Sequence, residues 1–263
     1  MITSTGKLLR FISGGNSKID KDVWSFSLPA GWSCPGAKAC MTKVDPETGK
    51  IIDGVYQKFR CFAAVDEVRP NVRDIRWHNF RLLIEAGTTE KMTELILASF
   101  PKGVKRMRVH VSGDFFNINY FDAWMAAARK IEDCKFYAYT KSLHILGKRQ
   151  DAGDIPPNFA LTLSDGGVWD DKIEALRTIA EDMQHGLGLS KVVFHPDEAE
   201  KLGLPIDHDD SHAEEGNHAF ALLLHSIQPA NSEAAEAVKL MKRTGIKFAY
   251  SKDHGRTKKS NTK

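Results

Sequence analysis

Three cysteines near the amino end are the residues of this chain best suited to chemistry. Five residues separate Cys34 from Cys40, and twenty more separate Cys40 from Cys61. Three thiolates can hold an iron–sulfur cluster by three of its four irons and leave the last iron open to a cofactor or substrate, whereas a fourth protein ligand would close the site. The three cysteines therefore predict a metal site. A coordination position left open at the metal would indicate an enzyme, whereas a closed site would indicate an electron carrier or a structural metal site.

Turn-forming residues around the cysteines can bring the three sulfurs to one centre. Pro35 and Gly36 directly follow the first cysteine and predict a turn there, because proline fixes one backbone angle. The polar stretch 42–58 contains two turns typical of a hairpin-like excursion that returns Cys61 to the same place. We therefore expect all three cysteines to be metal ligands, within residues 30–65.

Other interpretations of the cysteines stay open at this point. Cys34 and Cys40 have the spacing for a disulfide, and zinc is the main rival to iron–sulfur because His78 or His195 can complete a Cys₃His site. Cys134 precedes an apolar run and is expected to be a small buried hydrophobic residue outside the site. An iron–sulfur cluster, of the [4Fe–4S] type, is the interpretation that we favour.

Composition bounds the class of protein. The chain has 263 residues, of which 42% are hydrophobic, and this is enough for one α/β domain with a full core. A net charge of +3 gives no strong field that favours nucleic acid, and no apolar run is long enough to span a bilayer. Residues 1–10 lack the apolar core of a signal sequence, so we expect no membrane contact and a reducing cytoplasmic setting, in which a disulfide is disfavoured.

Short apolar runs alternate with helical patterns along most of the chain. Strands are expected at 107–111, 136–139, 159–163, 192–194, 219–224 and 246–250, with a candidate earlier strand at 23–28. Helices are expected at 71–85, 89–100, 120–131, 142–150, 171–183, 196–202 and 232–244. This alternation predicts parallel strands with covering helices.

We therefore expect an α/β fold, namely a partial or complete TIM-like barrel of parallel strands with an amino-terminal, cysteine-bearing extension. An open doubly wound sheet is the second candidate. Residues 1–252 are expected to form one domain, and 253–263 a flexible polar tail.

Polar residues follow each expected strand. Because the active sites of α/β barrels lie at the carboxyl ends of the strands, we expect several of these side chains to line one cavity. Each of them could instead cap the following helix, and the histidines could be structural. The candidate catalytic residues are Asp114, Lys141, Asp165, His225 and Lys252.

Two charged segments are ambiguous. Arg73 and Arg76 have helical spacing and could offer guanidinium groups to a phosphate or a carboxylate, although a solvated helix face is the expected reading. The acidic, histidine-rich stretch 207–215 lacks the spacing of a calcium loop and is expected to be a solvated loop. Lys102, Lys105, Arg106 and Arg108 precede or begin a strand, and are therefore expected near the opposite end of the sheet from the cavity.

Several runs of the sequence resemble the gene product 88 family of bacteriophage proteins. They are residues 27–37 (SLPAGWSCPGA), 59–64 (FRCFAA), 76–80 (RWHNF), 109–116 (VHVSGDFF) and 138–142 (AYTKS). The resemblance covers roughly residues 20–250 and implies a phage setting, in which nucleic acid or a nucleotide precursor is the expected substrate.

The early cysteine trio followed by barrel strands is also similar to radical S-adenosylmethionine enzymes, although their usual trio is more compact. That similarity implies a cluster whose open iron binds the amino and carboxylate groups of S-adenosylmethionine. It also implies a glycine-containing acidic turn that contacts the amine, and Ser112, Gly113 and Asp114 stand where such a turn would lie.

The expected function is thus that of a metal-dependent enzyme, most simply an iron–sulfur enzyme of the S-adenosylmethionine class. Its partner would be a small molecule or nucleotide, and nucleic acid is a further candidate. The rivals are a zinc enzyme that uses the same cysteines, and a non-catalytic phage protein that binds nucleic acid and holds a structural metal.

Overall fold

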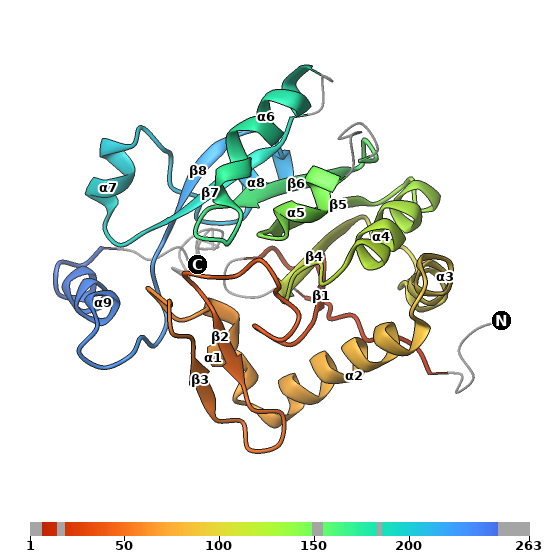
Figure 1. Cartoon of the computed structure of the whole chain (residues 1–263), viewed down its shortest axis with the longest axis horizontal. Coiled ribbons are helices and arrows are strands. Elements are labelled where there is room, and N and C mark those ends of the chain that lie inside the picture. The colour runs from red at the N-terminus through yellow and green to blue at the C-terminus, as the bar shows by residue number, and fades with distance from the viewer. Residues whose placement is uncertain (1–6, 15–18, 149–154, 183–185, 247–263) are drawn as a thin grey trace, which may run out of the picture.

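The fold is built on one parallel sheet. The computed structural model describes residues 7–14, 19–148, 155–182 and 186–246. Its six-stranded sheet has the order β1-β4-β5-β6-β7-β8, and every neighbouring pair is parallel (Figure 1). The strands are β1 (Val23–Ser27), β4 (Arg106–Ser112), β5 (Lys135–Thr140), β6 (Phe159–Ser164), β7 (Gly188–Val193) and β8 (Ala219–Leu223).

The parallel α/β sheet confirms the expected α/β class, but the described residues form no closed TIM-like barrel. Within the described residues no strand joins β8 to β1, so the sheet is open. The strands lie across the sheet in the same order as in the chain. A doubly wound sheet requires a point at which the strand order reverses, so the sheet is not doubly wound. The expected strand at 246–250 and the tail at 253–263 lie almost wholly outside the described residues.

Helices connect successive strands, as right-handed crossovers between parallel strands require. The amino-terminal extension has the antiparallel hairpin β2 (Thr42–Val44) and β3 (Ile51–Asp53), then α1 (Phe62–Glu67), α2 (Pro70–Ala86) and α3 (Thr89–Ser99). The later helices are α4 (Ile118–Lys130), α5 (Leu143–Lys148), the 3₁₀ turn η2 (Asp170–Lys172), α6 (Ile173–Asp182), α7 (Pro196–Lys201), α8 (Ser211–Glu215) and α9 (Glu233–Arg243). No helix in the described part of the chain is long and apolar enough to cross a membrane.

Capping residues explain where several helices begin. The side chain of Asn117 accepts from the amide of Tyr120 at the start of α4, and Ser232 accepts from the amide of Ala235 at the start of α9. This second cap lies at residue 232, where the last helix was expected to begin. Strand β7 begins at Gly188, earlier than the expected 192, because the polar and glycine residues of its first half hide the strand pattern.

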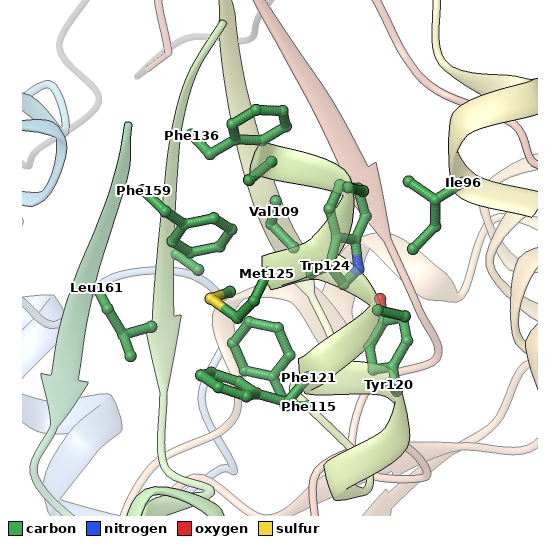
Figure 2. Packing of buried hydrophobic residues seen from close by; sticks show 14 of the residues in the cluster. Ile96, Val109, Phe115, Tyr120, Phe121, Trp124, Met125, Phe136, Phe159 and Leu161 are labelled. Atoms are coloured by element: carbon green, nitrogen blue, oxygen red, sulfur yellow. The ribbon is translucent and has the colours of Figure 1, made fainter. Parts of the chain in front are cut away.

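The main core lies between one face of the sheet and helices α3 and α4. Alternate residues of the strands point to this face, and large side chains from β4, β5, β6 and α4 fill it (Figure 2). Trp124 packs edge-on against Phe136, whose ring stacks on Phe159 at 5.8 Å. Cys134 is buried in this cluster, as expected. The core fixes the register of the strands that present the candidate site.

The acidic segment 207–215 is not a solvated loop, and that expectation is wrong. Part of it forms α8, which packs across β5 and β6 near the amino ends of the strands. Asp210 is 2% exposed and forms an ion pair with Arg108, while Glu214 pairs with Arg106 at 2.5 Å. The sequence could not show this, because the arginines and their partners are about a hundred residues apart.

Candidate functional site

The three amino-terminal cysteines line one cavity at the carboxyl ends of the strands. The cavity has a volume of about 530 Å³, which is within the range of small-molecule sites. Its lining includes Cys34, Cys40, Cys61, Ser112, Gly113, Asp114, Lys141 and His225. All four cysteines of the chain are free thiols, so the disulfide between Cys34 and Cys40 is not formed.

The loop that carries the first two cysteines is fixed by contacts with the ends of β5 and β6. A Cβ atom on Gly36 would lie 2.0 Å from the carbonyl oxygen of Lys141, so only glycine allows this approach. The amide of Ala39 donates to the carbonyl of Gly166 at 2.8 Å, and the amide of Val168 donates to the carbonyl of Gly36 at 2.9 Å. The turn predicted after Cys34 therefore reverses the chain and also packs the cysteine loop against the carboxyl ends of β5 and β6.

The hairpin of β2 and β3 returns Cys61 to the same cavity, as the turns predicted. The amide of Cys61 donates to the hydroxyl of Thr42 at 3.1 Å. The amide of Lys58 donates to the carbonyl of Ala39 at 2.7 Å, next to Cys40. The two cysteine-bearing segments are therefore hydrogen-bonded to each other.

The arginines of α2 are buried, so the expectation of a solvated helix face is wrong, and so is that of an anion site. Arg73 donates to the backbone carbonyls of Pro46, Glu67 and Val68. Arg76 donates to the carbonyl of Ala63 at 2.9 Å and to the carboxylate of Glu67 at 2.8 Å.

Glu67 extends this network to the first cysteine loop. Its carboxylate also accepts from the amide of Ala30, at 2.9 Å. Charged groups that are this deeply buried need such partners. The network therefore positions α1, which begins directly after Cys61, against the segment that leads to Cys34.

The turn formed by Ser112, Gly113 and Asp114 packs against the first cysteine loop. The amide of Leu28 donates to the carbonyl of Ser112 at 2.8 Å. Gly113 has a φ of 88°, and a Cβ atom there would lie 2.6 Å from the hydroxyl of Ser33. The hydroxyl of Ser112 is buried and has no hydrogen-bond partner within the described residues. This turn therefore offers the cavity an unsatisfied polar group.

Asp114 is buried at the wall of the cavity and does not cap α4. Its carboxylate accepts from the hydroxyl of Thr140 at 2.7 Å, from the amide of Lys141 at 2.8 Å and from the amide of Phe115 at 2.7 Å. Burial raises the pKa of Asp114, and these hydrogen bonds offset part of that effect. The side chain thus links the ends of β4 and β5 and holds a carboxylate beside the cysteines.

The other predicted catalytic residues divide into two groups. Lys141 and His225 line the cavity with Asp114, whereas Asp165 does not. Asp165 instead pairs with Lys191 at 3.2 Å, and only its backbone carbonyl accepts from the Lys141 ammonium. Lys252 lies outside the described residues.

His225 is the candidate histidine that lines the same cavity as the cysteines. Its ring stacks on Phe62 with the ring centres 3.9 Å apart. Gln228 holds this loop to the cysteine segment, because its side chain donates to the carbonyl of His225 at 2.7 Å and accepts from the amide of Arg60 at 2.8 Å.

The two histidines proposed from the sequence as zinc ligands lie elsewhere. The Nε2 atom of His78 lies 2.8 Å from the carbonyl oxygen of Leu8, and His195 caps the start of α7 beside a separate cavity. Neither lines the cysteine cavity.

The three thiols share one electrostatic environment. Burial raises the pKa of Cys34 well above its usual value, and the charges of Asp114, Cys61 and Cys40 raise it further. Burial also raises the pKa of Cys40, to about 11, although the Lys141 ammonium opposes it. The pKa of Cys61 is raised by burial and partly restored by the amides of Ala64 and Ala63. The protein alone therefore favours three neutral thiols.

The geometry as it stands is not that of a preformed metal-ion site. Within the described ranges, no three His, Cys, Asp or Glu side chains form a group that could hold a metal ion.

Comparison with known proteins identifies the family but not the reaction. The model of the Gene product 88 family matches residues 7–243. The chain belongs to the Gene product 88 family. No curated protein and no solved structure matches the chain. The comparisons thus confirm the phage family and give no support to a similarity with radical S-adenosylmethionine enzymes.

In this member of the Gene product 88 family, sequence reasoning missed two polar residues of the cavity, His110 and Arg108. His110 has a φ of 70° where the pairing of β1 with β4 shifts register, and its Nε2 atom lies 2.9 Å from the Tyr120 hydroxyl. Burial lowers the pKa of His110 to about 3, so the ring is neutral. Arg108 lies over the ring of Tyr139, at 5.0 Å. Arg108 was expected at the opposite end of the sheet from the cavity; it does pair with Asp210 there, but it also lines the cavity, so that expectation is wrong in part. The bulge at His110 has no sequence signal.

Proposed function

We propose that this protein is a metal-dependent enzyme in which Cys34, Cys40 and Cys61 bind a [4Fe–4S] cluster. The observation that carries the proposal is the convergence of three free cysteines, from two separate segments, on one cavity at the carboxyl ends of parallel strands. A structural clip would not need a cavity beside it. An enzyme requires space for a second reactant next to the open iron.

The electrostatics of the thiols support a cationic occupant. Each of the three thiols has a raised pKa, and Cys34 feels the charge of both other sulfurs. Binding to a metal deprotonates a thiol and offsets the repulsion between thiolates. A positively charged iron core would therefore make the thiolate forms of these cysteines favourable, which the protein alone does not.

S-adenosylmethionine is the proposed second reactant. The buried hydroxyl of Ser112 and the carboxylate of Asp114 are available beside the cysteines to an amino group, and Lys141 is available to a carboxylate. Val111, Val192 and Leu222 provide apolar walls of the cavity. When bound to a reduced cluster, this cofactor supplies one-electron cleavage of its carbon–sulfur bond, and the released fragment takes a hydrogen atom from a substrate.

The substrate class is inferred from the family alone. A bacteriophage family makes nucleic acid or a nucleotide precursor the proposed substrate, and the host cytoplasm the proposed setting. Zinc is the second candidate, because His225 lines the same cavity and could complete a Cys₃His site.

Metal analysis tests the proposal most directly. Protein reconstituted anaerobically with iron and sulfide should be brown and contain about four irons and four sulfides per chain, as a [4Fe–4S] cluster requires. Cys134→Ala is the matched control, because Cys134 is buried in the main core and should not affect the metal. Stoichiometric zinc in colourless protein, or loss of metal from the control variant, would contradict the assignment.

Cofactor binding tests the open position. The reconstituted protein should bind S-adenosylmethionine and, after reduction with dithionite, release 5′-deoxyadenosine. Asp114→Ala should weaken binding of the cofactor more than it lowers the iron content, because Asp114 borders the cavity without being one of the proposed ligands. An intact cofactor after incubation with reduced, cluster-loaded protein would rule out this chemistry, as would a histidine bound to the fourth iron.

A further inference from the structure

We propose that a row of aromatic side chains outside the cysteine cavity binds single-stranded nucleic acid. We define the aromatic row as Trp32, Trp77, Phe80 and Phe116. The inference goes beyond the proposed function and is independent of the metal, because no residue of the row lines the cavity or is a proposed ligand.

Ring contacts join the four side chains into one continuous row. The ring centre of Trp32 lies 5.9 Å from that of Trp77. Phe80 continues the row, because its ring centre lies 5.9 Å from that of Trp77 and 5.2 Å from that of Phe116. The row therefore brings together three segments of the chain, namely the first cysteine loop, α2 and the turn that follows β4.

The aromatic row is accessible to solvent. Trp32 is 41% exposed, and the other three rings are half-buried. The indole N–H of Trp32 donates to the carbonyl of Val44 at 2.9 Å, which fixes the orientation of this exposed ring. Helix α2, which carries two of the rings, lies at the periphery of the molecule (Figure 1). Aromatic rings that are held in place provide contact area at little cost in conformational entropy.

Two cations accompany the rings. The Lys43 ammonium lies 4.4 Å from the ring centre of Trp32, and the Arg81 guanidinium lies 5.7 Å from that of Trp77. Among the described residues, no carboxylate forms an ion pair with either cation. Residues 28–44, which include Trp32 and Lys43, contain no acidic residue. The aromatic row therefore combines rings with cations that are available to phosphate groups.

This combination favours a single-stranded nucleic acid over a protein partner. Lysine is depleted from the buried centres of protein interfaces, whereas Lys43 lies directly over an exposed ring of the row. Single-strand-binding proteins combine aromatic rings, on which bases stack, with cations that follow the phosphates. A duplex fits less well, because its paired bases are stacked on each other and do not expose their faces. Single-stranded DNA and RNA share the chemistry that the row requires, namely free base faces joined by phosphates.

Fluorescence anisotropy of the full-length protein tests the role of the rings. The probe is a fluorescein-labelled oligothymidylate of about 12 nucleotides, a length within the range of known single-strand sites. Trp32→Ala should weaken binding by about tenfold, because the stacking of one base on an aromatic ring contributes on that order. Trp32→Phe is the matched control, because it keeps an aromatic ring at the same position and should retain most of the affinity. Circular dichroism shows that each variant is folded.

The dependence of binding on salt tests the role of the cations. Lys43→Gln and Arg81→Gln should each make the plot of log K against log[salt] less steep by about 0.7, the value for one phosphate contact of a single strand. Lys102→Gln should keep the wild-type slope. It is the matched control, because this exposed lysine precedes β4, whereas the row lies beside the turn that follows β4.

Several results would overturn the proposal. They are a wild-type protein that does not bind the oligothymidylate, variants of Trp32, Lys43 and Arg81 that bind as the wild type does, and equal affinity for a duplex of the same length. If the wild type elutes as a dimer in gel filtration and Trp32→Ala as a monomer, the row is instead an interface between copies of the chain. Oligouridylate as a second probe distinguishes RNA from DNA.

The same experiment separates this inference from the proposed function. If the protein binds the oligonucleotide through the row but holds no iron–sulfur cluster, the proposed function fails and the inference stands. If a cluster forms but the row does not bind the oligonucleotide, the inference fails alone.

Discussion

The two ends of the parallel sheet both bury charged or ionisable residues, but they satisfy them differently. At the amino ends, Arg106 and Arg108 meet Glu214 and Asp210 in ion pairs. At the carboxyl ends, three thiols with raised pKa values share a cavity with Asp114. The charged groups of the amino end pair with one another within the protein, whereas the thiols and the carboxylate of the carboxyl end face a cavity.

This contrast teaches how to separate buried polar residues that stabilise the fold from those that serve a function. A buried charge with a full set of partners stabilises the fold and needs nothing further. A buried polar group without a partner, such as the Ser112 hydroxyl, costs free energy that the fold alone does not recover. The carboxyl end is therefore where a ligand is expected.

The largest expected effect is the loss of metal from the carboxyl end. Cys61→Ala should abolish cluster binding, since it removes one of the three proposed protein ligands. The free energy of unfolding of the metal-free protein should change by about 1 kcal/mol or less, because the truncated side chain is small and partly exposed. Iron analysis and urea unfolding measure the two quantities. Full iron content in this variant would contradict the assignment of Cys61 as a cluster ligand.

The amino end should show the opposite behaviour. Arg108→Leu leaves Asp210 buried without its cation, and this should lower the free energy of unfolding by about 3–5 kcal/mol. The iron content of the folded fraction should be unchanged. Replacing both partners, as Arg108→Leu with Asp210→Leu, should recover part of the loss. If the single variant unfolds as the wild type does, the ion pair does not stabilise this end of the sheet.

A smaller effect on stability is expected at Gln228, which supports the His225 loop at the carboxyl end of the sheet. Gln228→Ala removes one hydrogen bond to the amide of Arg60 and one to the carbonyl of His225 within its own loop, so the free energy of unfolding should fall by about 1–2 kcal/mol. Cluster content should stay at the wild-type level, because no proposed ligand is touched. A parallel loss of iron would show that this bridge belongs to the metal site and not to its support.

The last expected effect concerns pH and tests the electrostatic side of the comparison. Burial raises the pKa of Cys40 to about 11. In the metal-free protein the folded state therefore keeps a proton that the unfolded chain releases from about pH 8.5, the usual pKa of a cysteine. Stability should accordingly fall as the pH rises from that value toward 11.

Urea unfolding at several pH values, with reductant present, measures this decline. Cys40→Ala should flatten it in part. Arg106→Leu should keep the wild-type slope, because its partner Glu214 raises the pKa of Arg106 and the guanidinium stays charged over the whole range. A decline that is equally steep in Cys40→Ala and in the wild type would contradict the assignment.

The sequence predicted those features of the fold that depend on local patterns. Alternating apolar runs predicted five of the strands in the described sheet, and the earlier candidate at 23–28 is β1. The Pro-Gly turn and the polar hairpin predicted that the three cysteines would meet, which they do at the cavity. These signals are local, so a single sequence carries them.

What the sequence could not predict depends on contacts between distant segments. The burial of Arg73 and Arg76 follows from carbonyls and a carboxylate that neighbouring elements supply. Asp165 was expected in the cavity because it follows a strand, but its pairing with Lys191 on β7 keeps it outside. Barrel closure likewise depends on whether the two edge strands meet, and strand patterns do not encode that.

The support of the first cysteine loop sets an order of events during synthesis. Cys34 and Cys40 leave the ribosome early, yet the backbone that holds their loop comes from Lys141, Gly166 and Val168. A chain that is made from its amino end must therefore carry these thiols unanchored until more than half of it has been translated. Loading of a cluster would consequently be a late step, and the growing chain would depend on a reducing environment to keep its thiols available.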